Sequence, residues 1–283
     1  MTSFYRDALL KANEVRNKLG FDMFEPINIF DACLELGLTV RFLDVNMEGM
    51  YVTQDSSTNS TILLSSLRPL PRRCYTCGHE LGHHEFKHGT RVDSLADENG
   101  HQTSNRFEEI LVDCFAGALL MPDLGIQAEF TQRNWSVQNA TPIQFYTICS
   151  VFGTGYRTLI THCKANKLIT EFKAKELLRI TPAKIFKDLF PSSTLSSSYF
   201  KLFDGHSKIN KIDLEVSNHI IVPTKTIIEG NHLQKCQETD LGDGYIAIKP
   251  GIVRVFTEDS SFSSFIRIQN YQYTGLTLIA AYR

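Results

Sequence analysis

The five residues His79-Glu80-Leu81-Gly82-His83 place strict geometric demands on the fold of this chain. On a helix, residues four apart project about 40° from each other, so both imidazoles can reach one metal ion. Glu80 can then reach a water molecule bound to that ion. Zinc lowers the pKa of such a water to about 7, and a carboxylate can take its proton and pass it to a leaving amine. The pattern therefore predicts a helix with His79 and His83 as zinc ligands and Glu80 as catalytic base and acid.

A third ligand is expected on a second, strongly apolar helix predicted over 106–121. Glu109 and Asp113 lie four residues apart on one face of that helix, next to small and apolar residues that suit close helix packing. We expect Glu109 to complete the zinc site and Asp113 to bond the second nitrogen of a ligand histidine. Glu108, which is expected to face solvent, and His101, in the polar segment before the helix, are alternative ligands.

Other side chains that can bind a metal surround the motif. On one continuous helix, four of them project away from the ligand face and are expected to be structural: Cys74, Cys77, His84 and His88. Tyr75 shares the ligand face and is a candidate for stabilising an oxyanion, with core packing as the alternative.

The bulk composition narrows the class of protein. The chain has 283 residues, with 29 Lys and Arg against 31 Asp and Glu, and this near-neutral balance argues against wholesale nucleic-acid binding. No apolar run approaches the roughly 18 residues of a membrane span, and the N-terminus lacks the apolar stretch of a signal peptide. An odd count of seven cysteines is not typical of a disulfide framework. We therefore predict a cytoplasmic protein that does not bind membranes.

Hydrophobic patterns along the chain predict three parts. Residues 1–128 combine helices, at 4–18 and 27–37 and around the two motifs, with strands near 38–43, 50–53 and 61–65 and a loop over 89–105. Residues 129–190 form a helical segment, whose pattern is helical and basic from residue 141 on, with turns near 153–155 and 166. A serine-rich link then leads into a β-rich region that completes 191–283, with strand-like runs KIDLEV, HIIVP, TKTIIEG, YIAIK, IVRVF, SFIRI and LTLIAAY.

Two segments, CGHELGHHEFKHG (77–89) and EILVDCFAGALLMP (109–122), resemble the ImmA/IrrE family of zinc metallopeptidases, and the resemblance extends over about residues 5–185. It implies that His79, His83 and Glu109 bind zinc and that Glu80 is the catalytic base and acid. Leu111 stands where family members often have a second acidic residue, which favours Glu109 as the ligand. The implied fold is α+β, with a mainly helical zincin-like core and a small sheet, a helical segment of helix-turn-helix type, and a C-terminal β-rich sensor domain of GAF-like kind.

The resemblance also implies a function. Such enzymes are endopeptidases that cleave a cognate helix-turn-helix repressor, often encoded nearby, after DNA damage or a mobile-element or phage-defence signal. The substrate is expected to lie beside an edge strand, for which we choose 61–65. The C-terminal domain would sense a nucleic-acid or small-molecule activator.

Two further hypotheses come from the residues. A cysteine thiolate could restrain the enzyme by filling the fourth zinc position, with Cys149, Cys163 and Cys236 as candidates. The alternative function is a DNA-binding regulator or sensor with a structural zinc, in which helices near 141–150 and 154–164 form the helix-turn-helix. Arg157 and Thr158 would be its main base-reading residues.

Overall fold

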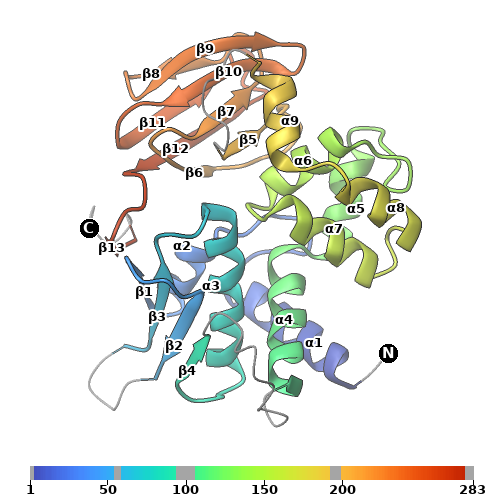
Figure 1. Ribbon diagram of the computed structural model, residues 1–283, viewed down its shortest axis with the longest axis vertical. Coiled ribbons are helices and arrows are strands. Elements are labelled where there is room, and N and C mark those ends of the chain that lie inside the picture. The colour runs from blue at the N-terminus through green and yellow to red at the C-terminus, as the bar shows by residue number, and fades with distance from the viewer. Residues whose placement is uncertain (1–2, 54–58, 94–105, 192–198, 278–283) are drawn as a thin grey trace. The chain divides into compact units, whose positions relative to one another are not determined.

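The computed structural model describes residues 3–53, 59–93, 106–191 and 199–277, and the chain forms two compact units. Unit 1 comprises residues 1–125 and 272–283, and unit 2 comprises residues 126–271. The described part is a mixture of helices and small sheets (Figure 1), in agreement with the predicted combination of α and β structure. The GAF-like and helix-turn-helix assignments stay predictions. Among the described residues, no helix combines the length and the apolar character needed to cross a membrane.

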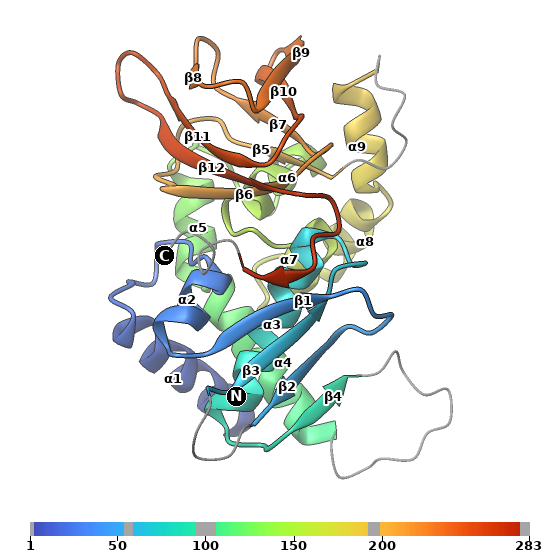
Figure 2. The same cartoon turned by 90° about the vertical axis from the view of Figure 1, so that its left-hand side faces the viewer.

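Unit 1 contains a five-stranded sheet in the order β13-β1-β3-β2-β4, whose first four strands in sequence appear side by side in Figure 2. The bounds are β1 Thr39–Leu43, β2 Gly49–Val52, β3 Thr61–Ser65, β4 Arg91–Asp93 and β13 Gly275–Leu276. Strands β1 and β3 run parallel, and the other neighbouring pairs run antiparallel.

Two of the predictions for this sheet are wrong. Strand β3 is not an edge strand, because β1 pairs with one side of it and β2 with the other. Residues 91–93 are not loop, because they pair with β2 as strand β4 despite their polar surroundings in the sequence. Among the described residues, β4 and β13 form the two edges of the sheet.

The helices of unit 1 are α1 Ser3–Lys18, α2 Ile29–Glu35, α3 Leu70–Glu85 and α4 Arg106–Leu120. They form a layer on this sheet, through α2 and α3, and a further layer, α4 and α1, on α3. Helix α3 packs on β2 and β3 and on α4, and α4 packs in turn on α1, as Figure 1 shows. Pro71 lies in the first turn of α3, where its missing N–H costs no hydrogen bond.

A buried arginine fixes the end of α4 against α1. The Arg16 guanidinium is fully buried and donates to the Leu119 carbonyl at 2.5 Å and to the Asp22 and Glu25 carbonyls. Burial is the main reason that the pKa of Arg16 falls to about 10. These bonds satisfy a carbonyl of the last turn of α4, which would otherwise lack a partner inside the helix.

Unit 2 begins within α5 and continues through four helices and eight strands of the described chain. The helices are α5 Asp123–Thr131, α6 Pro142–Val151, α7 Tyr156–Ala165, α8 Glu171–Leu178 and α9 Pro182–Leu189. The strands are β5 Phe200–Leu202, β6 Lys211–Glu215, β7 His219–Val222, β8 Ile227–Glu229, β9 Leu233–Thr239, β10 Gly242–Ala247, β11 Gly251–Phe256 and β12 Ser263–Gln269.

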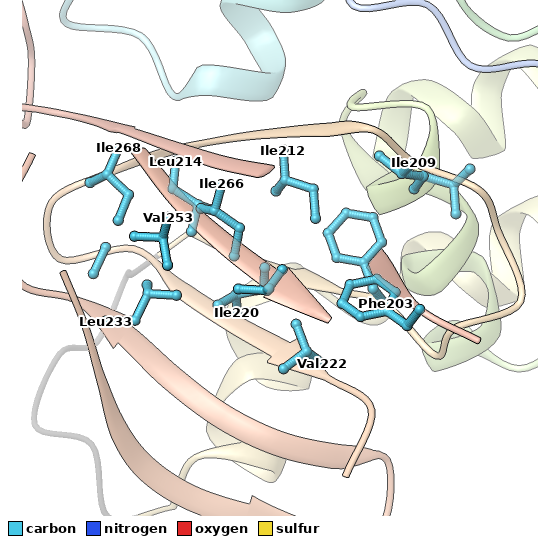
Figure 3. Close-up of a cluster of buried hydrophobic side chains, with 14 residues drawn as sticks. Phe203, Ile209, Ile212, Leu214, Ile220, Val222, Leu233, Val253, Ile266 and Ile268 are labelled. Carbon is cyan, nitrogen blue, oxygen red and sulfur yellow. The ribbon is translucent and has the colours of Figure 1, made fainter. Parts of the chain in front are cut away.

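These strands form two four-stranded sheets, in the orders β5-β7-β10-β9 and β6-β12-β11-β8. Each strand can turn one face to a core and the other to solvent, as alternating residues of β11 show: Val253 and Val255 are buried, while Ile252 and Arg254 are exposed. Figure 3 shows the buried cluster to which both sheets contribute, with Leu214, Val253 and Ile266 from one sheet and Ile220 from the other. Such a shared apolar core is what holds two packed sheets together.

Hydrogen bonds within unit 2 join the helical segment to the β-rich region. The Tyr146 hydroxyl of α6 donates to the Phe200 carbonyl at 2.8 Å, and the Leu202 N–H donates to the Ser150 hydroxyl at 3.1 Å. The buried Arg133 donates to both carboxylate oxygens of Asp204, at 2.6 and 2.7 Å. Helices and strands of this unit therefore share buried polar contacts as well as a core.

Candidate metal centre

Helix α3 brings His79 and His83 to one face, and α4 presents Glu109 to that face. The Nε2 atoms of the two histidines lie 3.2 Å apart. The Glu109 carboxylate lies 3.1 Å from His79 Nε2 and 3.6 Å from His83 Nε2. In the described part of the chain, this trio is the one group of three or more His, Cys, Asp or Glu side chains arranged to hold a metal ion.

The donor set of this trio fits zinc. Two imidazole nitrogens and one carboxylate oxygen are a known ligand set of catalytic zinc sites, which leave a fourth position open. With metal–ligand bonds of about 2.0–2.1 Å, a tetrahedral ion separates its ligand atoms by roughly 3.3 Å. The observed separations of 3.1, 3.2 and 3.6 Å bracket that value.

Burial and charge differ across the trio. The side chain of His83 is fully buried and that of His79 is 10% exposed, whereas that of Glu109 is 36% exposed. Hydrogen bonds with His79, and then with His83, hold the pKa of Glu109 well below its usual range. The carboxylate is therefore ionised, as a metal ligand must be, and the cluster opens to solvent on the Glu109 side.

Asp113 lies one turn after Glu109 and contacts the other side of the His79 ring. Its Oδ1 atom is 2.9 Å from His79 Nδ1, the distance of a hydrogen bond. With a proton on Nδ1, the Nε2 atom of His79 keeps a free lone pair, which faces Glu109 and His83.

Tyr75 also lies beside α4. Its hydroxyl donates to the Asp113 backbone carbonyl at 3.2 Å. Burial, and then the charge of Asp113, raises the pKa of Tyr75 above its ordinary value. The phenol therefore stays protonated at neutral pH and keeps its role as a donor.

Glu80 points from α3 toward the sheet. It is fully buried, and a Cβ atom on Gly49 of β2 would lie only 2.7 Å from its Oε1. The strand thus approaches α3 so closely here that a side chain on residue 49 would require Thr76 or Glu80 to shift. Of the predicted ligand rivals, Glu108 is not part of the trio, and His101 lies outside the described residues.

The prediction that His88 points away from the ligand face is wrong. It assumed a continuous helix, but α3 ends at Glu85 and Phe86 caps it. Lys87 then takes the left-handed conformation, with φ of 58°, and turns the chain back. As a result, His88 Nδ1 lies 3.0 Å from His83 Nδ1. The one sequence feature that pointed to this end of the helix was Gly89, because glycine favours a chain reversal and it stands just after the motif.

The remaining side chains near the motif lie apart from the trio. Cys77 is fully buried, with its sulfur 3.6 Å from that of Cys33 in α2. His84 lies beside Tyr51 of β2, with 2.8 Å between Nδ1 and the tyrosine hydroxyl. Cys74 is half-buried and forms no disulfide.

The cysteines predicted as candidates for the fourth metal position all belong to unit 2. Cys149 and Cys163 are buried, and the Cys149 thiol donates to the Tyr146 carbonyl at 3.2 Å. Burial raises the pKa of the Cys149 thiol, which keeps it protonated. Cys236 is exposed on β9. The hypothesis of thiolate restraint stays a prediction.

Comparison with known families adds one match. Residues 33–160 match the model of the Peptidase_M78 family, described as the IrrE N-terminal-like domain. The matched range contains all three residues of the trio, together with Glu80 and Asp113. A search of curated proteins finds no match to this chain.

Proposed function

We propose that this chain, which carries a peptidase domain of the IrrE N-terminal-like family over residues 33–160, is a zinc-dependent endopeptidase that cleaves a DNA-binding repressor. The observation that carries the proposal is the convergence of His79 and His83 of α3 with Glu109 of α4, beside the buried Glu80 of α3. The family match supports a metallopeptidase, as the resemblance of the two motifs led us to expect.

His79, His83 and Glu109 would hold the ion. When bound, zinc supplies a Lewis acid that polarises the scissile carbonyl and acidifies a water molecule. Glu80 takes the proton from the attacking water and later delivers it to the leaving amine. Glu80 is fully buried and directly follows His79 on α3, so its carboxylate is held next to the proposed metal site.

The substrate would bind as an extended segment. Strand β4 lies at an edge of the unit 1 sheet among the described residues, next to β2, which contacts Glu80 through Gly49. A peptide added alongside β4 gains backbone hydrogen bonds in register with the sheet. We therefore assign substrate addition to β4, in place of β3. Tyr75 stays a candidate for stabilising the oxyanion, for which its hydroxyl would leave the Asp113 carbonyl.

Replacing Glu80 tests the assignment. The Glu80→Gln variant should bind zinc as the parent chain does and lose cleavage of a candidate helix-turn-helix repressor by about 10²–10⁴-fold. Glu85→Gln, at the end of the same helix, is the matched control and should cleave normally. The readouts are the zinc content of the purified protein and a single discrete cut in the repressor. If the Glu80→Gln variant still cleaves the repressor, Glu80 is not the catalytic base and acid.

A DNA-binding regulator with a structural zinc is the other outcome of this test. In that case Glu80→Gln would keep the biological function, and the zinc-loaded parent would shift an operator fragment on a gel. If the protein instead binds nonspecific DNA, and that DNA increases cleavage of the repressor, nucleic acid is the activator sensed by the C-terminal domain.

A further inference from the structure

The end of α3 folds back on the second histidine of the motif. The Lys87 N–H donates to the His84 carbonyl at 3.1 Å, and the His88 N–H donates to the His83 carbonyl at 3.0 Å. With Lys87 left-handed, these two bonds form the paired pattern of a Schellman C-cap. The backbone of His88 is therefore fixed to that of His83 before the side chains are considered.

The His88 ring is held in place from two sides. It stacks on Phe86, with ring centroids 5.8 Å apart and planes 19° from parallel, and Phe86 packs edge-on against Phe115 of α4. It meets the His83 ring at 66°, with 5.2 Å between the centroids. These contacts direct His88 Nδ1 at His83 Nδ1, 3.0 Å away.

The two nitrogens of His83 face different partners. Nε2 faces the cluster, 3.2 Å from His79 Nε2 and 3.6 Å from Glu109. If Nε2 gives its lone pair to a cation, the neutral ring carries its proton on Nδ1. That N–H points at His88 and needs an acceptor there, because His83 is fully buried.

We propose that His88 is the positioning residue of His83: its Nδ1 atom accepts the hydrogen bond from His83 Nδ1–H, and so fixes the ring orientation and tautomer for metal binding. This inference rests on the proposed function. His79 has an acceptor in the equivalent place, the Asp113 carboxylate at 2.9 Å, but that acceptor is charged and His88 is neutral in this role.

Two substitutions separate this role from simple packing. His88→Phe keeps an aromatic ring on Phe86 but removes the acceptor. His88→Asn removes the ring but places an oxygen at the position of Nδ1. If His88 only packs, the Phe variant should bind zinc like the parent chain and the Asn variant should bind it more weakly. If His88 positions His83, the order is reversed.

Zinc affinity, measured by competition with a chromogenic chelator, is the readout. We expect His88→Phe to bind zinc about 10–100-fold more weakly than the parent chain, and His88→Asn to restore most of that loss. Parent-like affinity in the Phe variant, or an Asn variant as weak as it, would overturn the inference. Thermal unfolding of the metal-free proteins shows whether both variants are folded.

Nitrogen NMR of the zinc-loaded parent chain gives a second test that needs no variant. The expected spectrum has His83 protonated on Nδ1 and His88 protonated on Nε2. A proton on His88 Nδ1 contradicts the proposal. A parent chain that binds zinc but cleaves no repressor would defeat the proposed function alone, whereas one that binds no zinc would defeat both.

Discussion

Each histidine of the trio has a hydrogen-bonding atom from outside the trio beside its Nδ1: Asp113 for His79 and His88 for His83. Such partners orient a ligand ring and raise its basicity, and removing one typically costs 10–100-fold in metal affinity. The Asp113 side chain is 57% exposed, so solvent and salt screen its electrostatic interaction with His79. The direction of its hydrogen bond is not affected by this screening. Geometry rather than charge is therefore the main contribution expected of Asp113.

That expectation can be measured with two variants of Asp113. Asp113→Ala removes the acceptor and should weaken zinc binding by about 10-fold, at the lower end of the range for such partners because the site is exposed. Asp113→Asn keeps an oxygen in the same place and should lose much less. Chelator competition gives both affinities. Glu108→Ala is the control on the same helix, and a loss of zinc in that variant would favour Glu108 as the ligand.

The sequence could predict the convergence of the trio and Asp113 for two reasons. Helical spacing puts His79 with His83, and Glu109 with Asp113, on one face of their own helices, and the small and apolar residues beside Glu109 suit close packing of the two helices. Gly89 signals a chain reversal after the motif, but it does not fix the residue at which the helix stops, and the place of His88 depends on that residue. Lysine rarely adopts a left-handed conformation, so Lys87 gives no sign of the turn. Tertiary packing of Phe86 on Phe115 then holds the conformation.

Close packing of helices α3 and α4 sets the distance between the histidines and Glu109. Two glycines on α3, Gly78 and Gly82, face α4 one turn apart. A Cβ on Gly82 would lie 2.8 Å from Val112 Cβ, whereas one on Gly78 would lie 3.1 Å from the flexible end of Leu120. Gly82 therefore tolerates less added volume than Gly78.

The predicted cost follows that difference. Alanine is more favourable than glycine inside a helix by about 1 kcal/mol, but a methyl group forced into a tightly packed helix contact typically costs about 1–3 kcal/mol. Gly82→Ala should therefore lower both the free energy of unfolding and zinc affinity, and Gly78→Ala should change them less. Denaturant unfolding and chelator competition measure the two effects. Adding Val112→Ala to Gly82→Ala should recover part of the zinc affinity; no recovery would show that the contact with Val112 is not the cause.

The strands show where sequence patterns stop being informative. Buried apolar residues made β6, β7 and β11 predictable, but β9 has a mostly polar, solvent-facing sequence and was not predicted. The prediction that β3 is an edge strand was wrong for a different reason. Hydrophobicity reports burial, and it does not tell which strands lie on either side.

At the scale of the whole molecule, the sheet of unit 1 is completed by residues that follow unit 2 in the sequence. Strand β13 pairs with β1, with Arg41 opposite Leu276 and Phe42 opposite Gly275. The Thr277 N–H also donates to the Val40 carbonyl at 3.2 Å. Residues 126–271 therefore form a unit that is inserted, along the chain, between two parts of the other unit. The C-terminal run LTLIAAY was predicted to belong with the β-rich region, but its first residue, Leu276, is in this sheet.

Truncation tests what β13 contributes. A chain ending at Tyr271 loses β13, while a matched chain ending at Thr277 keeps it. Each net hydrogen bond contributes about 0.5–1.5 kcal/mol, so a strand of two residues should change the melting temperature of unit 1 by only a few degrees. Hydrogen exchange is the sharper measurement: amides over residues 39–43 should exchange faster in the shorter chain than in the longer one. Equal exchange in the two chains would mean that β13 adds nothing to the stability of β1.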